Sequence, residues 1–154
     1  MKFGGYACLF LRADLSGDVI VKGAFDKCLG QSRPAQIKML YQHDAMRPIG
    51  VWQKIKPTAQ GLWVEGEITT KARLGQDVAA LIRSGALDGL SIGFRARRAD
   101  KSRHGQRHLK EIELVEVSLV TFPMQPKARV VKIHAGSQNL APALRQAVAK
   151  VAVA

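Results

Sequence analysis

Apolar and polar residues alternate along much of the first two-thirds of the chain, and this two-residue period predicts β-strands. The clearest stretch is 62–69, in which three aliphatic residues and Gly66 fall on one face, whereas Trp63 and two glutamates fall on the other. The Gly17-Asp18 step predicts a hairpin between the first two strands. Apolar runs bounded by turn residues predict further strands at 3–12, 19–21, 37–43, 49–55, 90–94, 112–122 and 129–133.

One segment has a helical period. Four apolar residues spaced i, i+4, i+7 and i+8 would share one helical face: Leu74, Val78, Leu81 and Ile82. Gly85 follows directly, as expected just beyond a helix C-terminus. We therefore predict a helix over 73–84. A shorter helical turn is expected at 24–29, closed by Gly30.

These elements predict a mainly β domain, a β-barrel with one clear helix and a few short helical turns, over residues 1–135. The basic stretch 97–108, with its Gly105, is expected to be the loop of a hairpin. Residues 136–154 form an Ala-rich basic tail with weak helical spacing, and we expect a frayed end there.

Composition excludes several classes of protein. The chain has 154 residues, 47% of them hydrophobic, which is enough for one domain with a sizeable core. No apolar run approaches the ~20 residues that cross a bilayer, and the first residues lack a signal-peptide core. Cys8 and Cys28 do not make a disulfide framework and fit a reducing interior better.

The charge of the chain is compatible with an acidic partner, but it does not identify one. The net charge is +12, and the excess is concentrated in 95–110 and 127–154. The first stretch carries seven Lys and Arg residues against Asp100, and the second carries five with no acid. Such a surface attracts nucleic acid, acidic protein or anionic membrane. A solvated loop with a solubilising tail explains the charge equally well.

A serine and a histidine are candidates for nucleophilic catalysis. Ser91 lies in the sequence GLSIG at 89–93, where small neighbours let a substrate backbone approach. A strand serine bonded to backbone is the commoner situation, and the expected helix precedes Ser91, unlike in a nucleophile elbow. His43 ends an apolar strand beside a loop, a good catalytic position. It can equally be a half-buried histidine bonded to Asp44.

The third candidate is an acid. Glu116 stands within the apolar run 112–122, where burial is costly unless the carboxylate is paired. On pattern alone, the solvent face of an alternating strand is the favoured position for it.

Other chemistry-bearing residues give weaker signals. His104 and His108 have zinc-like i, i+4 spacing, but basic neighbours oppose a cation and no third ligand is close, so no metal site is predicted. His134 has no obvious partner. Cys8 is expected to be an inert core thiol, and a cysteine nucleophile at Cys8 or Cys28 is a distant alternative.

Four stretches of the chain resemble the prohead (procapsid maturation) proteases of tailed phages, a family related in fold to the herpesvirus assemblins. They occur in the family's order and cover about residues 3–133. The first joins 5–7 to the hairpin sequence DVIVKGAF, the second is the histidine motif LYQHD with PIG, the third is the serine motif GALDGLSIGF, and the closing motif is ELVEVSLVT with Pro123, Pro126 and Ala128. The match does not cover 97–108 or the tail.

The resemblance implies a serine endopeptidase with a herpesvirus-protease-like fold and no metal or cofactor. Carried onto the matching positions, Ser91 is the nucleophile and His43 is the general base. Assemblins use a second histidine as the third member, whereas the phage relatives use an acid. Glu116 is the residue in place, and Asp44 is its competitor. We prefer Glu116 because adjacent strand residues point apart.

The resemblance also implies where the protein acts. Its substrates would be scaffold, the N-terminal region of the major capsid protein and the chain itself, inside a procapsid of a phage or phage-like particle in the bacterial cytoplasm. A homo-oligomer and nonspecific DNA contact are further candidates, and a membrane is not expected. The tail becomes a candidate self-cleaved or scaffold-docking segment, and residues 126–129 become candidates for the oxyanion donors.

Two rival classes remain at this point. One is a basic nucleic-acid- or scaffold-binding β-barrel without catalytic activity, supported by the charge. The other is a structural capsid component that has kept the protease fold. Cleavage of a capsid protein discriminates both from the enzyme.

Overall fold

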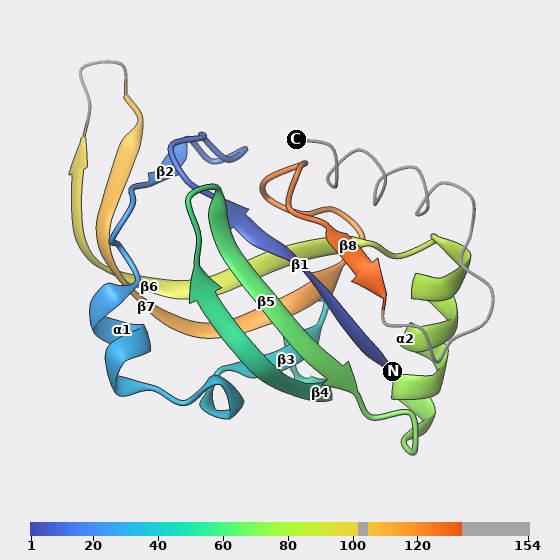
Figure 1. The fold of residues 1–154 in the computed structure, drawn as a ribbon. Helices are drawn as coiled ribbons and strands as arrows, with labels where there is room; N and C mark the ends of the chain where they lie inside the picture. The colour runs from blue at the N-terminus through green and yellow to red at the C-terminus, as the bar shows by residue number, and fades with distance from the viewer. Residues whose placement is uncertain (102–104, 134–154) are drawn as a thin grey trace.

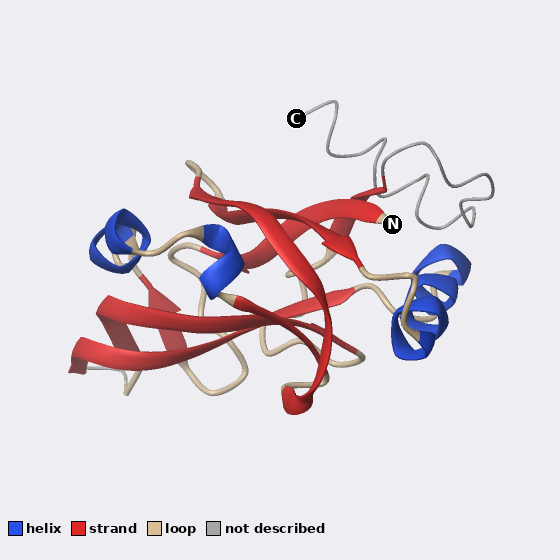
Figure 2. Ribbon diagram, turned by 90° about the horizontal axis from the view of Figure 1, so that it is seen from below, coloured by secondary structure: helices blue, strands red, loops and turns tan. Residues whose placement is uncertain are grey.

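A computed structural model describes residues 1–101 and 105–133. This part of the chain forms one strongly curved eight-stranded sheet with helices at its two ends (Figures 1 and 2). The strands are β1 (Lys2–Leu9), β2 (Asp18–Ile20), β3 (Lys38–Tyr41), β4 (Asp44–Pro57), β5 (Gly61–Ile68), β6 (Gly89–Lys101), β7 (Arg107–Val120) and β8 (Val130–Ile133). The helices are α1 (Asp26–Gln31), a 3₁₀ turn (Pro34–Gln36) and α2 (Arg73–Ser84).

The sheet is ordered β2-β7-β3-β4-β5-β1-β8, and β6 also pairs with β7. Strands β2 and β3 both run parallel to β7, whereas β6 pairs with it antiparallel. The two ends of the curved sheet approach each other just before β8. There Leu90 N donates to the Ala128 carbonyl at 2.9 Å, and Val130 N donates to the Asp88 carbonyl at 2.8 Å. These bonds hold residues 128–130 beside the start of β6.

The hydrophobic core fills the concave side of the sheet. Phe3 and Trp52 pack edge to face with ring centroids 5.5 Å apart, and both are almost fully buried. Helix α2 covers one end with Val78, Ala79 and Ile82, each at most 1% exposed. Burial of each large apolar side chain stabilises the fold by about 1.5–3 kcal/mol. The core therefore makes a rigid support for the strands that carry polar residues.

Two predicted elements are confirmed closely. Helix α2 spans Arg73–Ser84, and Gly85 follows it in the left-handed conformation, with φ of 78°. Strand β5 spans Gly61–Ile68 and buries the face that was expected to be apolar. The mainly β class is likewise confirmed, as a sheet curled into a half-barrel. Among the described residues, no helix is long and apolar enough to cross a membrane.

Three predicted features are wrong in detail. The turn at Gly17-Asp18 is present, but β2 joins β7, and its contact with the segment after β1 is limited to an isolated bridge, Ala13–Val19, with flanking backbone hydrogen bonds. Helix α1 continues through Gly30 to Gln31, because the backbone of that glycine is not left-handed. The frayed end predicted for residues 136–154 is not one of the three, because these residues lie outside the described part of the chain.

The third error is the basic loop. Strands β6 and β7 continue through most of 97–108 as a two-stranded ribbon, seen at the left of Figure 1. Ion pairs join its strands: Lys110 to Asp100, and Arg95 and Arg97 to Glu113. Residues 95–101 of β6 are exposed on both faces of the ribbon, so this part of the sequence carries no apolar alternation by which a strand could be recognised.

Candidate active site

His43 lies in a tight turn between β3 and β4. Gln42 and His43 have φ of 56° and 59°, and they connect the paired residues Tyr41 and Asp44. Positive φ at both central residues is typical of a type I′ hairpin turn, which glycine and asparagine favour. A glutamine and a histidine in this conformation store backbone strain, and such strain persists only where surrounding contacts hold it.

Gln42 supplies those contacts at the end of β7. Its backbone N–H donates to the Leu119 carbonyl at 2.9 Å. Its side-chain amide donates to Thr121 Oγ1 at 2.7 Å and accepts from the Thr121 N–H at 3.2 Å. Gln42 therefore fixes the turn that carries His43 to the end of β7 by three hydrogen bonds of its own.

The His43 ring meets Glu116, which lies on β7. Nδ1 of His43 is 2.6 Å from Oε1 of Glu116, and the glutamate is only 7% exposed. A carboxylate can only accept, so Nδ1 carries the proton and Nε2 is the ring nitrogen left for other chemistry. Burial of Glu116 contradicts the solvent-face position that the alternation favoured. Its cost is offset because the carboxylate is paired.

Ser118 links the two residues. Its buried hydroxyl donates to Oε2 of Glu116 at 2.5 Å and accepts the backbone N–H of His43 at 3.3 Å. Both carboxylate oxygens thus have a partner, and the turn and the acid are held by one side chain. The sequence reasoning missed Ser118, although its position two residues after Glu116 puts both on one strand face.

Glu116 changes the protonation of His43. The hydrogen bond from the ring to Glu116 raises the pKa of His43 above its ordinary value of 6.5. Partial burial of the ring lowers that pKa, and the negative charge of Glu116 raises it again, with the net effect upward. A histidine with its pKa raised by a buried acid is a stronger base than a free one.

Ser91 lies on the same face of the sheet, on β6. It pairs across the strands with Ser118, and Gly93 pairs with Glu116. Ser91 is 4% exposed. It lines a cavity of about 40 Å³, and Cys8, Phe94 and Gln125 also line it. The structure therefore brings Ser91 and Glu116 to the adjacent strands β6 and β7, with His43 in the β3–β4 turn beside Glu116. Within the described chain, no hydrogen bond joins the Ser91 hydroxyl to His43.

Asp44 does not share the site. Its side chain is exposed, and Oδ1 accepts the Met46 N–H at 2.9 Å within its own turn. The acid in contact with the His43 ring is Glu116.

The other candidates lie elsewhere. Cys8 is 2% exposed, and burial raises the pKa of its thiol to about 12, so it is protonated at neutral pH. The Cys28 thiol donates to the Phe25 carbonyl at 3.2 Å. His108 is on β7 opposite Asp100, not on a helix, and His104 and His134 fall outside the described residues. Residues 1–101 and 105–133 contain no cluster of three metal-binding side chains.

Comparison with protein families gives one family over most of the chain. A family described as caudovirus prohead serine protease matches residues 1–141. The prohead protease of Enterobacteria phage HK97 is 31% identical over 131 residues, and that of Escherichia phage T5 is 33% identical over 125. These alignments cover 83% and 80% of this chain. The chain spans 58% of the length of each relative.

Solved structures share the fold at low sequence identity. The capsid assembly protease of bacteriophage T4 has a TM-score of 0.63 and 14% identity, over 77% of this chain and 80% of that one. The protease of Kaposi's sarcoma-associated herpesvirus has a TM-score of 0.60 and 13% identity, over 99% and 76%. Varicella-zoster virus protease has a TM-score of 0.55 and 12% identity, over 84% and 62%. The expected herpesvirus-protease-like fold is confirmed.

Proposed function

The chain belongs to the caudovirus prohead serine protease family, and on this premise we propose that it is a serine endopeptidase with Ser91, His43 and Glu116 as its catalytic residues. The observation that carries the proposal is the 2.6 Å contact between His43 Nδ1 and Glu116, beside a strand face that also carries Ser91. A buried acid, a histidine that it orients and a neighbouring serine are the parts of a triad, whatever their chain order.

The proposed reaction starts from neutral His43. Glu116 accepts the Nδ1 proton, so the basic lone pair is on Nε2. Nε2 takes the proton of Ser91 as the hydroxyl oxygen attacks the peptide carbonyl. The imidazolium that forms is stabilised by the Glu116 carboxylate, and it then gives its proton to the leaving amine. Water, activated in the same way, hydrolyses the acyl-enzyme.

The negative oxygen of the tetrahedral intermediate requires hydrogen-bond donors. We assign these to the backbone N–H groups of Lys127 and Arg129, because Pro126 has no N–H and that of Ala128 donates to the Gln125 carbonyl at 2.8 Å. Support comes from the bonds that hold this stretch beside the strand of Ser91, at Ala128 and Val130. The Arg129 side chain secures the stretch further, since Nη1 pairs with Asp88 and Nε donates to the Pro126 carbonyl at 2.8 Å.

The proposed biological role is supported by the relatives, which are named prohead proteases. We propose that the chain cleaves scaffold, the N-terminal region of the major capsid protein and itself, inside an assembling procapsid in the bacterial cytoplasm. The buried Glu116–His43 pair supports an enzyme over a protein that only binds, because titratable groups with a shifted pKa cluster at functional sites.

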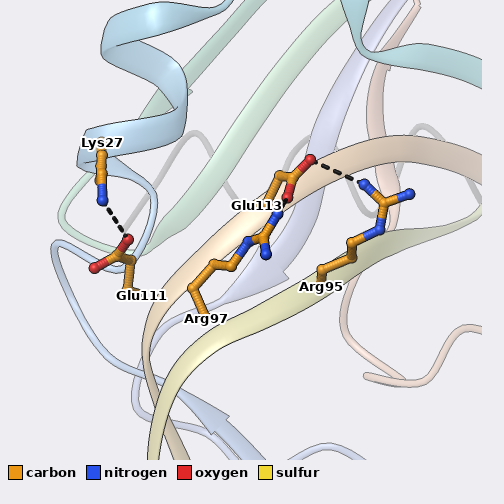
Figure 3. Close-up of polar contacts among 5 residues, drawn as sticks. All are labelled: Lys27, Arg95, Arg97, Glu111 and Glu113. Carbon is orange, nitrogen blue, oxygen red and sulfur yellow. Dashed lines mark hydrogen bonds and ion pairs between the residues drawn. The ribbon is translucent and has the colours of Figure 1, made fainter.

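The alternative of a basic binding barrel receives less support. Figure 3 shows that Arg95 and Arg97 both reach Glu113, and that Lys27 reaches Glu111 at 3.0 Å. Part of the positive charge in the β6–β7 ribbon is therefore offset by local acids, which weakens the field available to attract nucleic acid.

The test is intact mass after co-expression with the major capsid protein of the same particle. Wild type and Ser16→Ala, an exposed serine control, should shorten the capsid protein, whereas Ser91→Ala should leave it whole. If wild type leaves the capsid protein and itself uncut under assembly conditions, the proposed function is wrong and the binding barrel becomes the better account.

A further inference from the structure

The position of the Glu116 carboxylate depends on a residue that has no side chain. Gly93 lies on β6 directly opposite Glu116 in the antiparallel pairing with β7. A Cβ atom built on Gly93 would lie 2.2 Å from Oε1 of Glu116, and 2.8 Å from its Cδ and its Cγ. Real Cβ atoms do not approach other atoms this closely, so the carboxylate occupies the space that a side chain at position 93 would fill.

The oxygen concerned is the one that binds the histidine. Oε1 of Glu116 is 2.6 Å from His43 Nδ1, while Oε2 receives the Ser118 hydroxyl. A methyl group on residue 93 therefore has to displace the very atom that orients His43. The nearest neighbours of that methyl are all atoms of the Glu116 side chain, which can rotate away without a change in the backbone.

The requirement for glycine here is one of space. Gly93 is extended strand, and its φ is not positive, so its backbone suits any residue. Glycine in a strand interior weakens the strand, and a close approach by another group is one of the reasons for its presence there.

We propose that Gly93 is a positioning residue: because it has no side chain, the carboxylate of Glu116 has room to lie against His43. The proposal deepens the proposed function, since it assigns a role at the same site. The proposed nucleophile and the residue that makes room for Glu116 then come from one short segment. Ser91 and Gly93 lie on one strand face and pair with Ser118 and Glu116. The spacing Ser-x-Gly on β6 opposite Glu-x-Ser on β7 is thereby explained.

The first measurement is the pKa of His43, from NMR titration of its ring protons in the full chain. Gly93→Ala should lower this pKa relative to wild type, in the same direction as Glu116→Gln. Gly30→Ala is the matched control, because a Cβ there meets nothing within 4 Å, and it should leave the pKa unchanged. A folded Gly93→Ala protein with an unchanged His43 pKa would overturn the proposal.

The second measurement is a double-mutant cycle of melting temperatures, which remains informative even if Gly93→Ala folds poorly. Glu116→Ala removes all three atoms that the new methyl group would meet. Gly93→Ala should therefore lower the melting temperature in the wild-type background and have a much smaller effect in the Glu116→Ala background. Equal losses in both backgrounds would show that Glu116 does not occupy the space at Gly93.

Neither measurement uses peptide cleavage. A failure of the proposed protease function therefore leaves the test of Gly93 intact, and a failure at Gly93 leaves the assignment of Ser91 and His43 standing.

Discussion

Strands β6 and β7 place charged residues in two very different settings. Where β7 pairs with both β3 and β6, Glu116 is 7% exposed and its two oxygens are bound by His43 and Ser118. Nearer the start of β7, Glu113 is only half-buried and is shared between Arg95 and Arg97 (Figure 3). The two glutamates are three residues apart on the same strand.

The difference lies in what water does to each contact. Water and salt screen the pairs of the ribbon, so they add little to stability. Water is largely excluded around Glu116, so its contact with His43 is stronger and its loss more damaging. The comparison teaches that the number of ion pairs on a strand says little about where charge matters, whereas burial says a great deal.

The largest expected effect comes from neutralising one glutamate at a time. Glu116→Gln should reduce the rate of peptide cleavage by about 10⁴-fold, the loss typical when a triad acid becomes an amide. The amide can stabilise the wrong tautomer of His43 and carries no charge to balance the imidazolium. Glu113→Gln is the control and should leave the rate almost unchanged. Similar losses for both variants would remove the distinction, and the measurement is a single-turnover rate on one peptide.

The pH dependence of cleavage should sharpen the comparison. His43, the proposed general base, must be neutral to act, and its hydrogen bond to Glu116 raises its pKa. The rate should therefore rise with pH through a midpoint above 6.5. In Glu116→Gln the midpoint should move to lower pH, because burial then opposes the charged ring without compensation. Glu113→Gln should keep the wild-type midpoint, and a shift as large as that of Glu116→Gln would contradict the account.

The same raised pKa makes stability depend on pH. His43 binds its proton more tightly in the folded chain than in the unfolded chain. Its contribution is therefore fully present below about 6.5 and is lost as pH rises through the folded pKa. Thermal melts across this range should show a smaller decline for Glu116→Gln than for wild type.

Removal of the link at Ser118 should cost stability. Ser118→Ala leaves Oε2 of Glu116 and the His43 N–H without their partners, at a cost of about 1–3 kcal/mol. Chemical denaturation measures this loss, and the exposed Ser16→Ala provides the baseline. A value near zero would mean that the hydroxyl does not hold the acid.

The smallest effect is expected in the ribbon. Arg97 beside Glu113 holds the pKa of that carboxyl below its usual range, and Lys110 does the same for Asp100. Asp100→Asn and Glu113→Gln should still change the melting temperature only slightly, and less at high salt, because Asp100 is exposed and Glu113 remains partly open to solvent. A large loss that persists in high salt would show that the ribbon is structural in a way its exposure does not indicate.

The sequence identified those parts of the fold whose signals are local. Helix 73–84 has an amphipathic period and a glycine stop, and both are visible without knowledge of the rest of the chain. Strand β2 lacks such a signal for its partner, because its anchor, the pairing of Asp18 with Arg107 at 2.5 Å, spans 89 residues. The ribbon was missed because charged residues on both faces hide the strand period.

The site could be predicted only in part for the same reason. The pattern offered Ser91, His43 and Glu116 as candidates and the resemblance implied their roles, while alternation alone favoured solvent for Glu116. Its burial follows from the approach of the β3–β4 turn, which no local pattern describes. The roles of Ser118 and Gly93 become visible only when β6 and β7 are in register.

The central claim is that His43 and Glu116 activate Ser91, and covalent labelling tests it most directly. A peptidyl or alkyl phosphonate that reacts with activated serines should add once to the wild-type chain, and peptide mass spectrometry should locate the adduct on Ser91. His43→Ala should label far more slowly, and Ser91→Ala should not label at all. An adduct on another residue, or equal labelling of wild type and His43→Ala, would contradict the account.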